Sequence, residues 1–217
     1  MRAHFAARGA GTIIAGLAAL VMLMAGAALA KPPAAIAELL TRASDGALDK
    51  LSQPGAFSAD DAIRIALPGA GKLGGLMGMS DKLGVTKDLN KSLNSAAEMA
   101  AGKAKPIFRD AIHGMTIEDT ASVLTGGDTA ATEYLEKSSG ERIIGEIRPL
   151  VADALEKAGA FKHGKSLQKL GLTEDKLTDH VADRTAAGIF KYMGAEETRL
   201  RENPIGGLKS LLKDWRR

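Results

Sequence analysis

Apolar residues recur at helical spacing along most of this chain, and they alternate with polar residues over only one short stretch. The helical pattern is continuous enough to predict about eight amphipathic helices, separated by glycine, proline and helix-capping residues. Alternating strands and helices, which a parallel sheet would need, are absent. The predicted helices cover residues 34–51, 86–101, 107–112, 117–124, 129–138, 143–158, 177–193 and 208–215.

The strand-like stretch lies near residues 62–68. Isoleucine and leucine alternate there with small or charged residues, and Pro68-Gly69 closes the run. We expect at most one short β-ribbon at this place. We also expect Pro149 to kink or interrupt the helix of residues 143–158, because proline lacks an N–H and clashes with the preceding turn. The fold class is therefore mainly α, a single-domain multi-helix bundle.

The first thirty residues have the features of an export signal. Arg2 and Arg8 precede an apolar stretch that ends at the small-residue sequence Ala28-Leu29-Ala30. This order is typical of a signal peptide, which predicts cleavage after Ala30 and a periplasmic mature domain of residues 31–217. The alternative is an uncleaved anchor in the inner membrane, because the apolar stretch is nearly long enough to span a bilayer.

Composition narrows the chemistry. The chain has no cysteine, which excludes disulfides, thiol catalysis and thiolate metal sites. Aromatic residues make up 4% of the chain, which favours helices packed through small residues. The formal net charge falls from +3 to +1 when Arg2 and Arg8 leave with the signal peptide. The chain has no basic stripe with interleaved aromatic residues, so no nucleic-acid partner is expected.

The segment from Leu124 to Tyr134 is the strongest candidate site. A diglycine turn runs into a helix, and Asp128 or Thr129 is placed to cap that helix. A capped turn explains the glycines and the caps, whereas a ligand site would also explain the density of hydroxyls and acids. Asp128 argues against a strongly anionic ligand, since its carboxylate competes for the same N–H donors. The candidate ligand-binding residues are Thr125, Gly126, Gly127, Asp128, Thr129, Thr132, Glu133 and Tyr134.

Other motifs carry less chemistry. Gly69-x-Gly71-x-x-Gly74 resembles a dinucleotide fingerprint, but Pro68 and the lack of a suitable acid argue against it, so no cofactor is expected. The mature histidines are scattered, and His180 with Asp183 lacks a third ligand, so no metal site is expected. The paired acids Glu196-Glu197 would need a second group across a cleft for acid–base chemistry. No nucleophile motif identifies catalytic residues.

Five segments carry a resemblance to a known family. They are Ile63–Pro68, Leu93–Glu98, Ile117–Asp119, Leu124–Tyr134 and Glu202–Gly206. In them the chain resembles the bacterial exported proteins called domain of unknown function 4197, over about residues 35–215. Leu135 departs from the phenylalanine usual in that family. The resemblance implies an exported, largely helical protein and supplies no activity, substrate or catalytic residue.

These patterns favour a non-enzymatic binding or protein-interaction module with a protein or small-molecule partner in the periplasm. A hydrolase-like enzyme is one alternative, with Asp128, Glu133 and His113 acting at the Gly126–Tyr134 junction. A peripheral membrane protein is another, because residues 207–217 form a basic amphipathic segment suited to weak contact with an anionic membrane surface.

Overall fold

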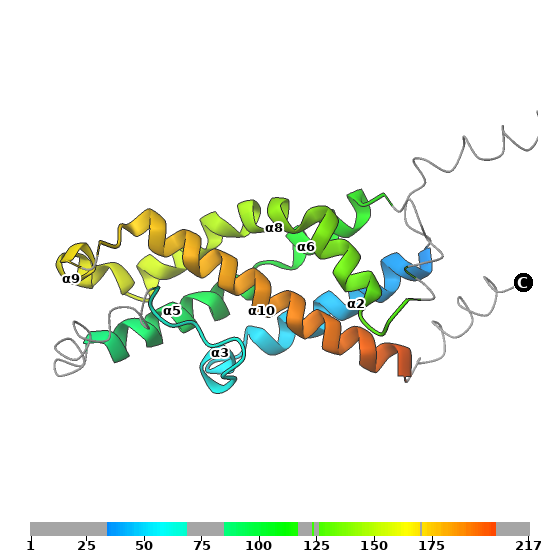
Figure 1. Ribbon diagram of the computed structural model, residues 1–217, viewed down its shortest axis with the longest axis horizontal. Helices are drawn as coiled ribbons and strands as arrows, with labels where there is room; N and C mark the ends of the chain where they lie inside the picture. The colour runs from blue at the N-terminus through cyan, green and yellow to red at the C-terminus, as the bar shows by residue number, and fades with distance from the viewer. Residues whose placement is uncertain (1–33, 69–84, 117–122, 124–125, 170, 203–217) are drawn as a thin grey trace, which may run out of the picture.

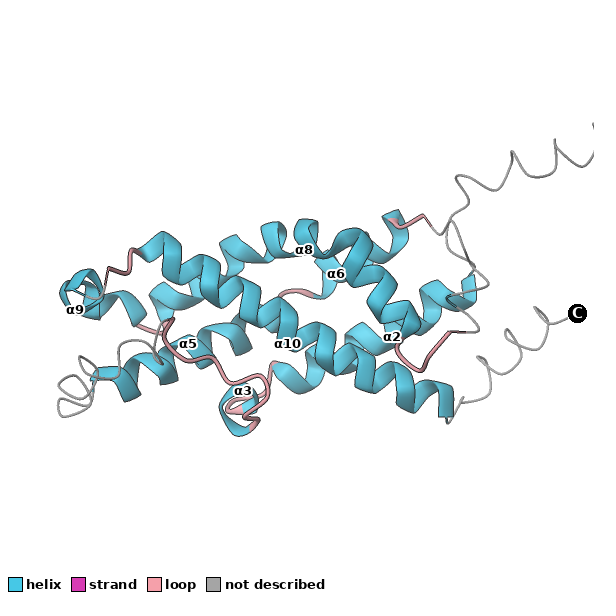
Figure 2. Cartoon of the chain, viewed as in Figure 1, coloured by secondary structure: helices cyan, strands magenta, loops and turns pink. Residues whose placement is uncertain are grey.

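The structure is a computed structural model that describes residues 34–68, 85–116, 123, 126–169 and 171–202. The described residues are mainly helical and contain no strand, which confirms the mainly α prediction (Figure 2). None of the described helices is both long and apolar enough to cross a membrane. The predicted signal peptide lies outside the described residues. The helices are α2 (Ala34–Leu51), α3 (Ala56–Ala59), α5 (Val85–Ala101), α6 (Lys105–Gly114), α8 (Ala130–Lys157), the 3₁₀ helix η1 (Ala160–His163), α9 (Gly164–Lys169) and α10 (Glu174–Glu202).

Helix α10 is the central element of the bundle. It runs along the length of the molecule and packs against both α8 and α2 (Figure 1). Helix α5 packs on α8, and α6 lies against both α2 and α8. The last helix in the described chain therefore contacts elements from the beginning and the middle of the sequence.

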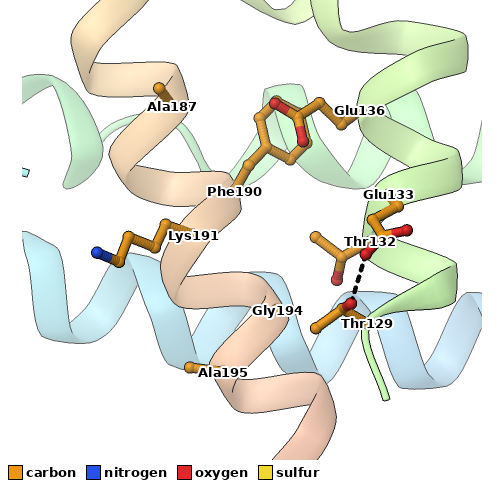
Figure 3. Close-up of a pocket in the computed structure, with 9 residues that line it drawn as sticks. All are labelled: Thr129, Thr132, Glu133, Glu136, Ala187, Phe190, Lys191, Gly194 and Ala195. Carbon is orange, nitrogen blue, oxygen red and sulfur yellow. Dashed lines mark hydrogen bonds between the residues drawn. The ribbon is translucent and has the colours of Figure 1, made fainter. Parts of the chain in front are cut away.

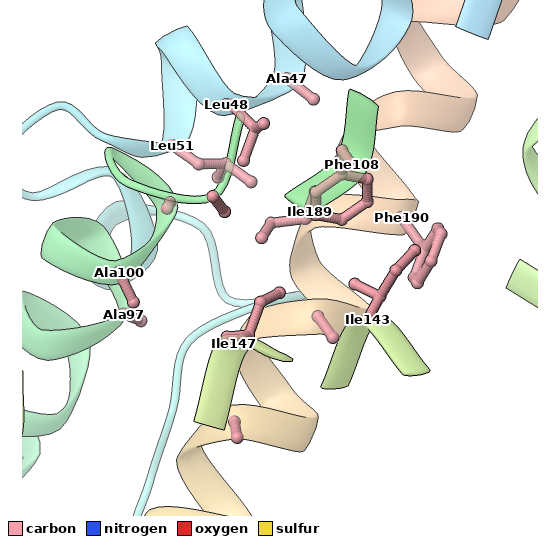
Figure 4. Packing of buried hydrophobic residues seen from close by; sticks show 14 of the residues in the cluster. Ala47, Leu48, Leu51, Ala97, Ala100, Phe108, Ile143, Ile147, Ile189 and Phe190 are labelled. Carbon is pink, nitrogen blue, oxygen red and sulfur yellow. The ribbon is translucent and has the colours of Figure 1, made fainter. Parts of the chain in front are cut away.

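The core is built from aliphatic side chains, many alanines and the three aromatic rings of Phe57, Phe108 and Phe190. The rings of Phe108 and Phe190 meet edge to face with centroids 5.6 Å apart. Ile143, Ile147 and Ile189 are also buried in this core (Figure 4). A fully buried side chain of this size contributes about 1.5–3 kcal/mol relative to an exposed one. The alanines, among them Ala47, Ala97 and Ala100, allow the helices to approach closely.

The prediction of about eight separate helices is not confirmed. Two predicted helices, over residues 129–138 and 143–158, are one continuous helix, α8, which includes Pro149. Of the two effects predicted for Pro149, the interruption is therefore wrong, and a kink stays a prediction. Pro149 is exposed, so water can satisfy the carbonyl that loses its helical N–H partner. The predicted helices of residues 117–124 and 208–215 lie outside the described residues, apart from Val123.

The β-ribbon near residues 62–68 is not confirmed either. Ile63, Ile65 and Leu67 are buried, and the residues between them are exposed, so the predicted alternation is present. The segment is extended, but its polar partners are side chains of α5. The Ile65 N–H donates to Asn94 Oδ1 at 2.9 Å, and Asn94 Nδ2 donates to the Ile65 carbonyl at 2.7 Å. One asparagine amide thus replaces a neighbouring strand.

Further side chains hold the same extended segment. The Leu67 N–H donates to Asn90 Oδ1 at 3.1 Å, and His180 Nε2 lies 2.9 Å from the Ala66 carbonyl oxygen. The segment is thereby fixed between α5 and α10 without a second strand.

Candidate functional site

Helix α8 begins at the predicted junction, and a residue far away in the sequence caps it. The carboxylate of Glu197, in α10, accepts hydrogen bonds from the N–H groups of Ala131 at 3.0 Å and Thr132 at 2.8 Å. Glu197 is fully buried. The first N–H groups of a helix lack partners within it and favour negative charge. Glu197 therefore completes the start of α8.

The prediction that the side chain of Asp128 or Thr129 caps α8 is wrong. Thr129 does occupy the position before the first helical residue, but its side chain makes no capping hydrogen bond. The Thr129 hydroxyl instead donates to Glu133 Oε1 at 2.6 Å. Asp128 is exposed to solvent.

Arg201 balances the buried charge of Glu197. Its Nε and Nη2 donate to Glu197 Oε1 at 2.9 and 2.7 Å, and Nη2 also donates to the carbonyl of Val123 at 3.1 Å. The pair joins α10, the start of α8 and the chain before the junction. Because Glu197 takes two N–H donors at this helix end, they are not free for an anionic ligand.

The neighbouring Glu196 joins α10 to α2 through an ion pair. It is buried, pairs with Lys50 of α2, and accepts hydrogen bonds from Arg199 Nη2 at 2.7 Å and Nε at 2.9 Å. Burial acts to raise the pKa of Glu196, but the hydrogen bonds from Lys50 and Arg199 outweigh it, so the pKa lies below its ordinary value. A Cβ on Gly46 would lie 3.2 Å from Glu196 Oε2, which explains why glycine suits that position.

A groove opens between the first turns of α8 and the middle of α10 (Figure 3). Its volume is about 370 Å³, and we call it the α8–α10 groove. Small residues of α10 form part of its surface, namely Ala187, Gly194 and Ala195. Its larger side chains are Thr129, Thr132, Glu133 and Glu136 from α8, with Phe190 and Lys191 from α10.

The predicted site residues fall into two groups. Thr129, Thr132 and Glu133 line the α8–α10 groove. Tyr134 instead lines a separate hollow of about 420 Å³ with Gly114 and Ser138, and its hydroxyl donates to the Thr116 carbonyl at 2.7 Å.

The remaining predicted residues do not join the groove. Gly126, Gly127 and Asp128 are exposed and line neither hollow, and Thr125 lies outside the described residues. The structure thus does not bring Asp128, Glu133 and Tyr134 into one cleft, as the hydrolase-like alternative requires.

The Thr132 hydroxyl is the most informative atom of the groove. Thr132 is 3% exposed, and its Oγ1 has no hydrogen-bond partner in the described structure. Figure 3 shows the side chain directed from α8 toward α10. Buried polar atoms nearly always have a partner, because an unpaired one costs about 1–3 kcal/mol. Thr132 lines the groove, so a group that enters the groove lies next to a residue whose hydroxyl lacks a hydrogen bond.

The charges around the groove are uneven. Glu133 and Glu136 are exposed on the α8 wall. Lys191 extends its ammonium group away from α8 (Figure 3). Its charge acts on Asp60, whose pKa is lowered mainly by hydrogen bonds from the Ala62 N–H and the Tyr192 hydroxyl, with smaller contributions from Lys191 and Arg64. The exposed charges on the α8 side of the groove are therefore carboxylates.

Comparison with known proteins adds the family. A model described as "Protein of unknown function (DUF4197)" matches residues 30–214. The chain belongs to this family. No curated protein and no solved structure matches it. The resemblance carried by the sequence is thus confirmed, and the family's description assigns no activity.

Three of the five segments that carry the DUF4197 resemblance have structural roles in the described residues. Ile63–Pro68 contacts Leu93–Glu98 through the hydrogen bonds between Ile65 and Asn94. Within the second segment, Glu98 Oε1 also accepts the N–H of Phe57 at 3.3 Å, at the start of α3. Leu124–Tyr134 includes the beginning of α8, which Glu197 caps. In these three segments, the described side chains hold the fold together.

No three histidines or carboxylates in the described ranges lie close enough together to hold a metal ion. Sequence reasoning missed the α10 half of the groove and Glu136. The sequence does contain a pair of acids, Glu196 and Glu197, within an apolar helical stripe, which is unusual. Their spacing could not show that Glu197 contacts the start of α8.

Proposed function

We propose that this chain is a non-enzymatic binding module of the periplasm that holds a small ligand in the α8–α10 groove. The observation that carries the proposal is the unpaired, buried hydroxyl of Thr132 at the wall of an open groove. Binding sites commonly combine an apolar surface with a few fixed polar groups. The volume of about 370 Å³ suits a small organic molecule.

Both walls of the groove are fixed by packing, which supports a preformed site. A Cβ on Gly194 would lie 3.1 Å from Thr129 Cγ2, so the two helices approach closely at one end. Phe190 packs on Phe108, which fixes the ring at the base. A preformed site loses less entropy when a ligand binds than a site that must be ordered first.

The test is a screen of small organic molecules against residues 31–217 by ligand-observed NMR, followed by mapping on amide spectra. We expect binders to shift the amides of Thr129, Thr132 and Ala195 more than those around Tyr134. Ala195→Phe fills the groove at an exposed position and should abolish binding, whereas Ala34→Phe, exposed at the start of α2, should not. If no molecule of any charge class binds the groove, the proposed function is wrong.

The periplasmic location is tested on the full chain. We expect the periplasmic fraction to contain a protein whose intact mass corresponds to a start at Lys31. Retention of the complete chain in the membrane fraction would instead support the inner-membrane anchor.

Residues 207–217 lie outside the described residues, so their weak contact with a membrane surface stays a prediction. Flotation with anionic liposomes, before and after deletion of these residues, separates this alternative from ligand binding in the groove.

A further inference from the structure

We infer that the ligand of the α8–α10 groove is a small alkylamine, bound through its ammonium group. This inference rests on the proposed binding function and names the chemical class of the ligand. The evidence comes from which hydrogen-bonding groups the groove leaves available and which it does not.

The carboxylates of the α8 wall accept hydrogen bonds, and Glu133 Oε1 already accepts one from the Thr129 hydroxyl. Glu133 and Glu136 are one turn apart and exposed, and neither is paired with a cation among the described residues. Thr132 Oγ1 is buried and unpaired, so both its donor and its acceptor positions are unused, and an ammonium group would take an acceptor position. An ammonium group offers three N–H donors and no acceptor, so it matches such a wall. Hydrogen bonds between ionised groups are about twice as strong as neutral ones.

The donors that would favour an anion are directed elsewhere. The N–H groups of Ala131 and Thr132 at the start of α8 are taken by Glu197. Lys191 points its ammonium group away from α8. An anionic ligand would meet the carboxylates of Glu133 and Glu136 on the α8 wall, while the ammonium group of Lys191 lies on the far side of α10 from them.

The α10 wall suits an aliphatic stem. Ala187 and Ala195 are small and exposed, and the edge of Phe190 lies between them along the helix. A linear stem can lie along this surface and bury apolar area, at about 25 cal/mol per Å². A bulky head group is less well accommodated where Gly194 meets Thr129.

The experiment is calorimetric titration of residues 31–217 with 1,5-diaminopentane, and with 1,5-pentanediol as an uncharged probe of the same length. We expect the diamine to bind and the diol to bind at least tenfold more weakly. We expect the affinity for the diamine to fall as salt rises from 20 to 300 mM, since salt screens exposed charges. The same titration is repeated with a tripeptide that contains lysine and has blocked ends. Comparison with the diamine distinguishes binding of a free amine from binding of a side-chain ammonium group.

Two variants connect the binding to the groove. Glu136→Gln should weaken diamine binding roughly tenfold, as expected for one lost charge-assisted hydrogen bond. Glu141→Gln, exposed on the same helix but outside the groove, should leave it unchanged. Thr132→Val should also weaken binding while leaving the melting temperature equal or higher, because it removes a hydroxyl that has no partner in the protein. A merely structural threonine would give the opposite pattern.

The outcomes separate this inference from the proposed function. If neutral or anionic molecules bind at Thr132 and the diamine does not, the ligand class is wrong and the binding function stands. If the diamine binds equally well to Glu136→Gln and Glu141→Gln, the inference is overturned. If nothing binds the groove, both fail.

Discussion

Two regions of this protein pair otherwise unpartnered backbone groups with side chains of different charge. The start of α8 and the extended segment of residues 63–67 both contain backbone groups without partners in their own element. In both, a side chain from a distant helix supplies the partner. At α8 that side chain is charged Glu197, neutralised by Arg201, and at the extended segment it is the neutral amide of Asn94. The charged solution joins more elements, but it depends on a buried ion pair.

The largest effect should come from Glu197→Ala. The change leaves two N–H groups unpaired and Arg201, whose side chain is 18% exposed, without its carboxylate. Removing one partner of a buried pair costs about 3–5 kcal/mol. Urea denaturation of residues 31–217 measures this loss. Glu202→Ala, exposed at the end of the same helix, is the control, and a loss below 1 kcal/mol in Glu197→Ala would contradict the role of the cap.

The second effect should come from Asn94→Ala. It removes the partners of both the N–H and the carbonyl of buried Ile65, which we expect to cost about 2–3 kcal/mol. Asn90→Ala removes one bond, to Leu67, and should cost about 1 kcal/mol. Hydrogen exchange should show the Ile65 amide opening faster in Asn94→Ala. Equal losses in the two asparagine variants would mean that the extended segment is held by packing instead.

A third comparison uses two glycines of α10. A Cβ on Gly188 would lie 2.9 Å from Cε1 of Phe57, a fully buried ring, whereas a Cβ on Gly194 meets the half-buried Thr129 at 3.1 Å. Overpacking costs about 1–3 kcal/mol, and alanine gains about 1 kcal/mol in helix propensity. We therefore expect Gly188→Ala to lower the melting temperature and Gly194→Ala to leave it nearly unchanged. The reverse order would show that the start of α8 is the more rigid region.

The smallest effect should be a dependence on pH. The lowered pKa of Glu196 means that the folded state favours its charged form. The stability from its pairs with Lys50 and Arg199 is present above the ordinary pKa of 4.5 and is lost as the pH falls below it. The stability difference between Glu196→Gln and the unmodified chain should therefore shrink between pH 6 and pH 3. A difference that does not change with pH would mean that these pairs contribute nothing.

How far the sequence predicts this protein depends on the distance between interacting residues. The 3.6-residue period over residues 34–51 predicted α2, because a helix face is a local property. The alternation of Ile63, Ile65 and Leu67 correctly predicted which side chains are buried. It gave the wrong partner, because Asn94 lies 29 residues away and no local pattern identifies an amide as a substitute strand.

In the candidate site, too, the residues predicted from local sequence were found and those that depend on distant contacts were missed. Thr129, Thr132 and Glu133 were predicted from the helix start and do line the groove. Phe190 was missed because the apolar stripe that contains it is typical of a core face. Exposed Lys191 was missed because its position beside the groove depends on tertiary packing. Glu197 was missed for the same reason, since 65 residues separate it from the Thr132 N–H that it accepts.

The cap of α8 by Glu197 has a consequence for the order in which the molecule is assembled. The chain is synthesised from its N-terminus, so α2, α5, α6 and α8 all exist before the residue that completes the start of α8. Helix α10 also covers α2, so the first of the described helices lacks its main neighbour until the last of them is made. Contacts between such distant segments slow folding, because long loops must close first. A nascent chain that ends before Glu197 thus lacks the carboxylate that caps α8, so we expect the bundle to close only after α10 has been made.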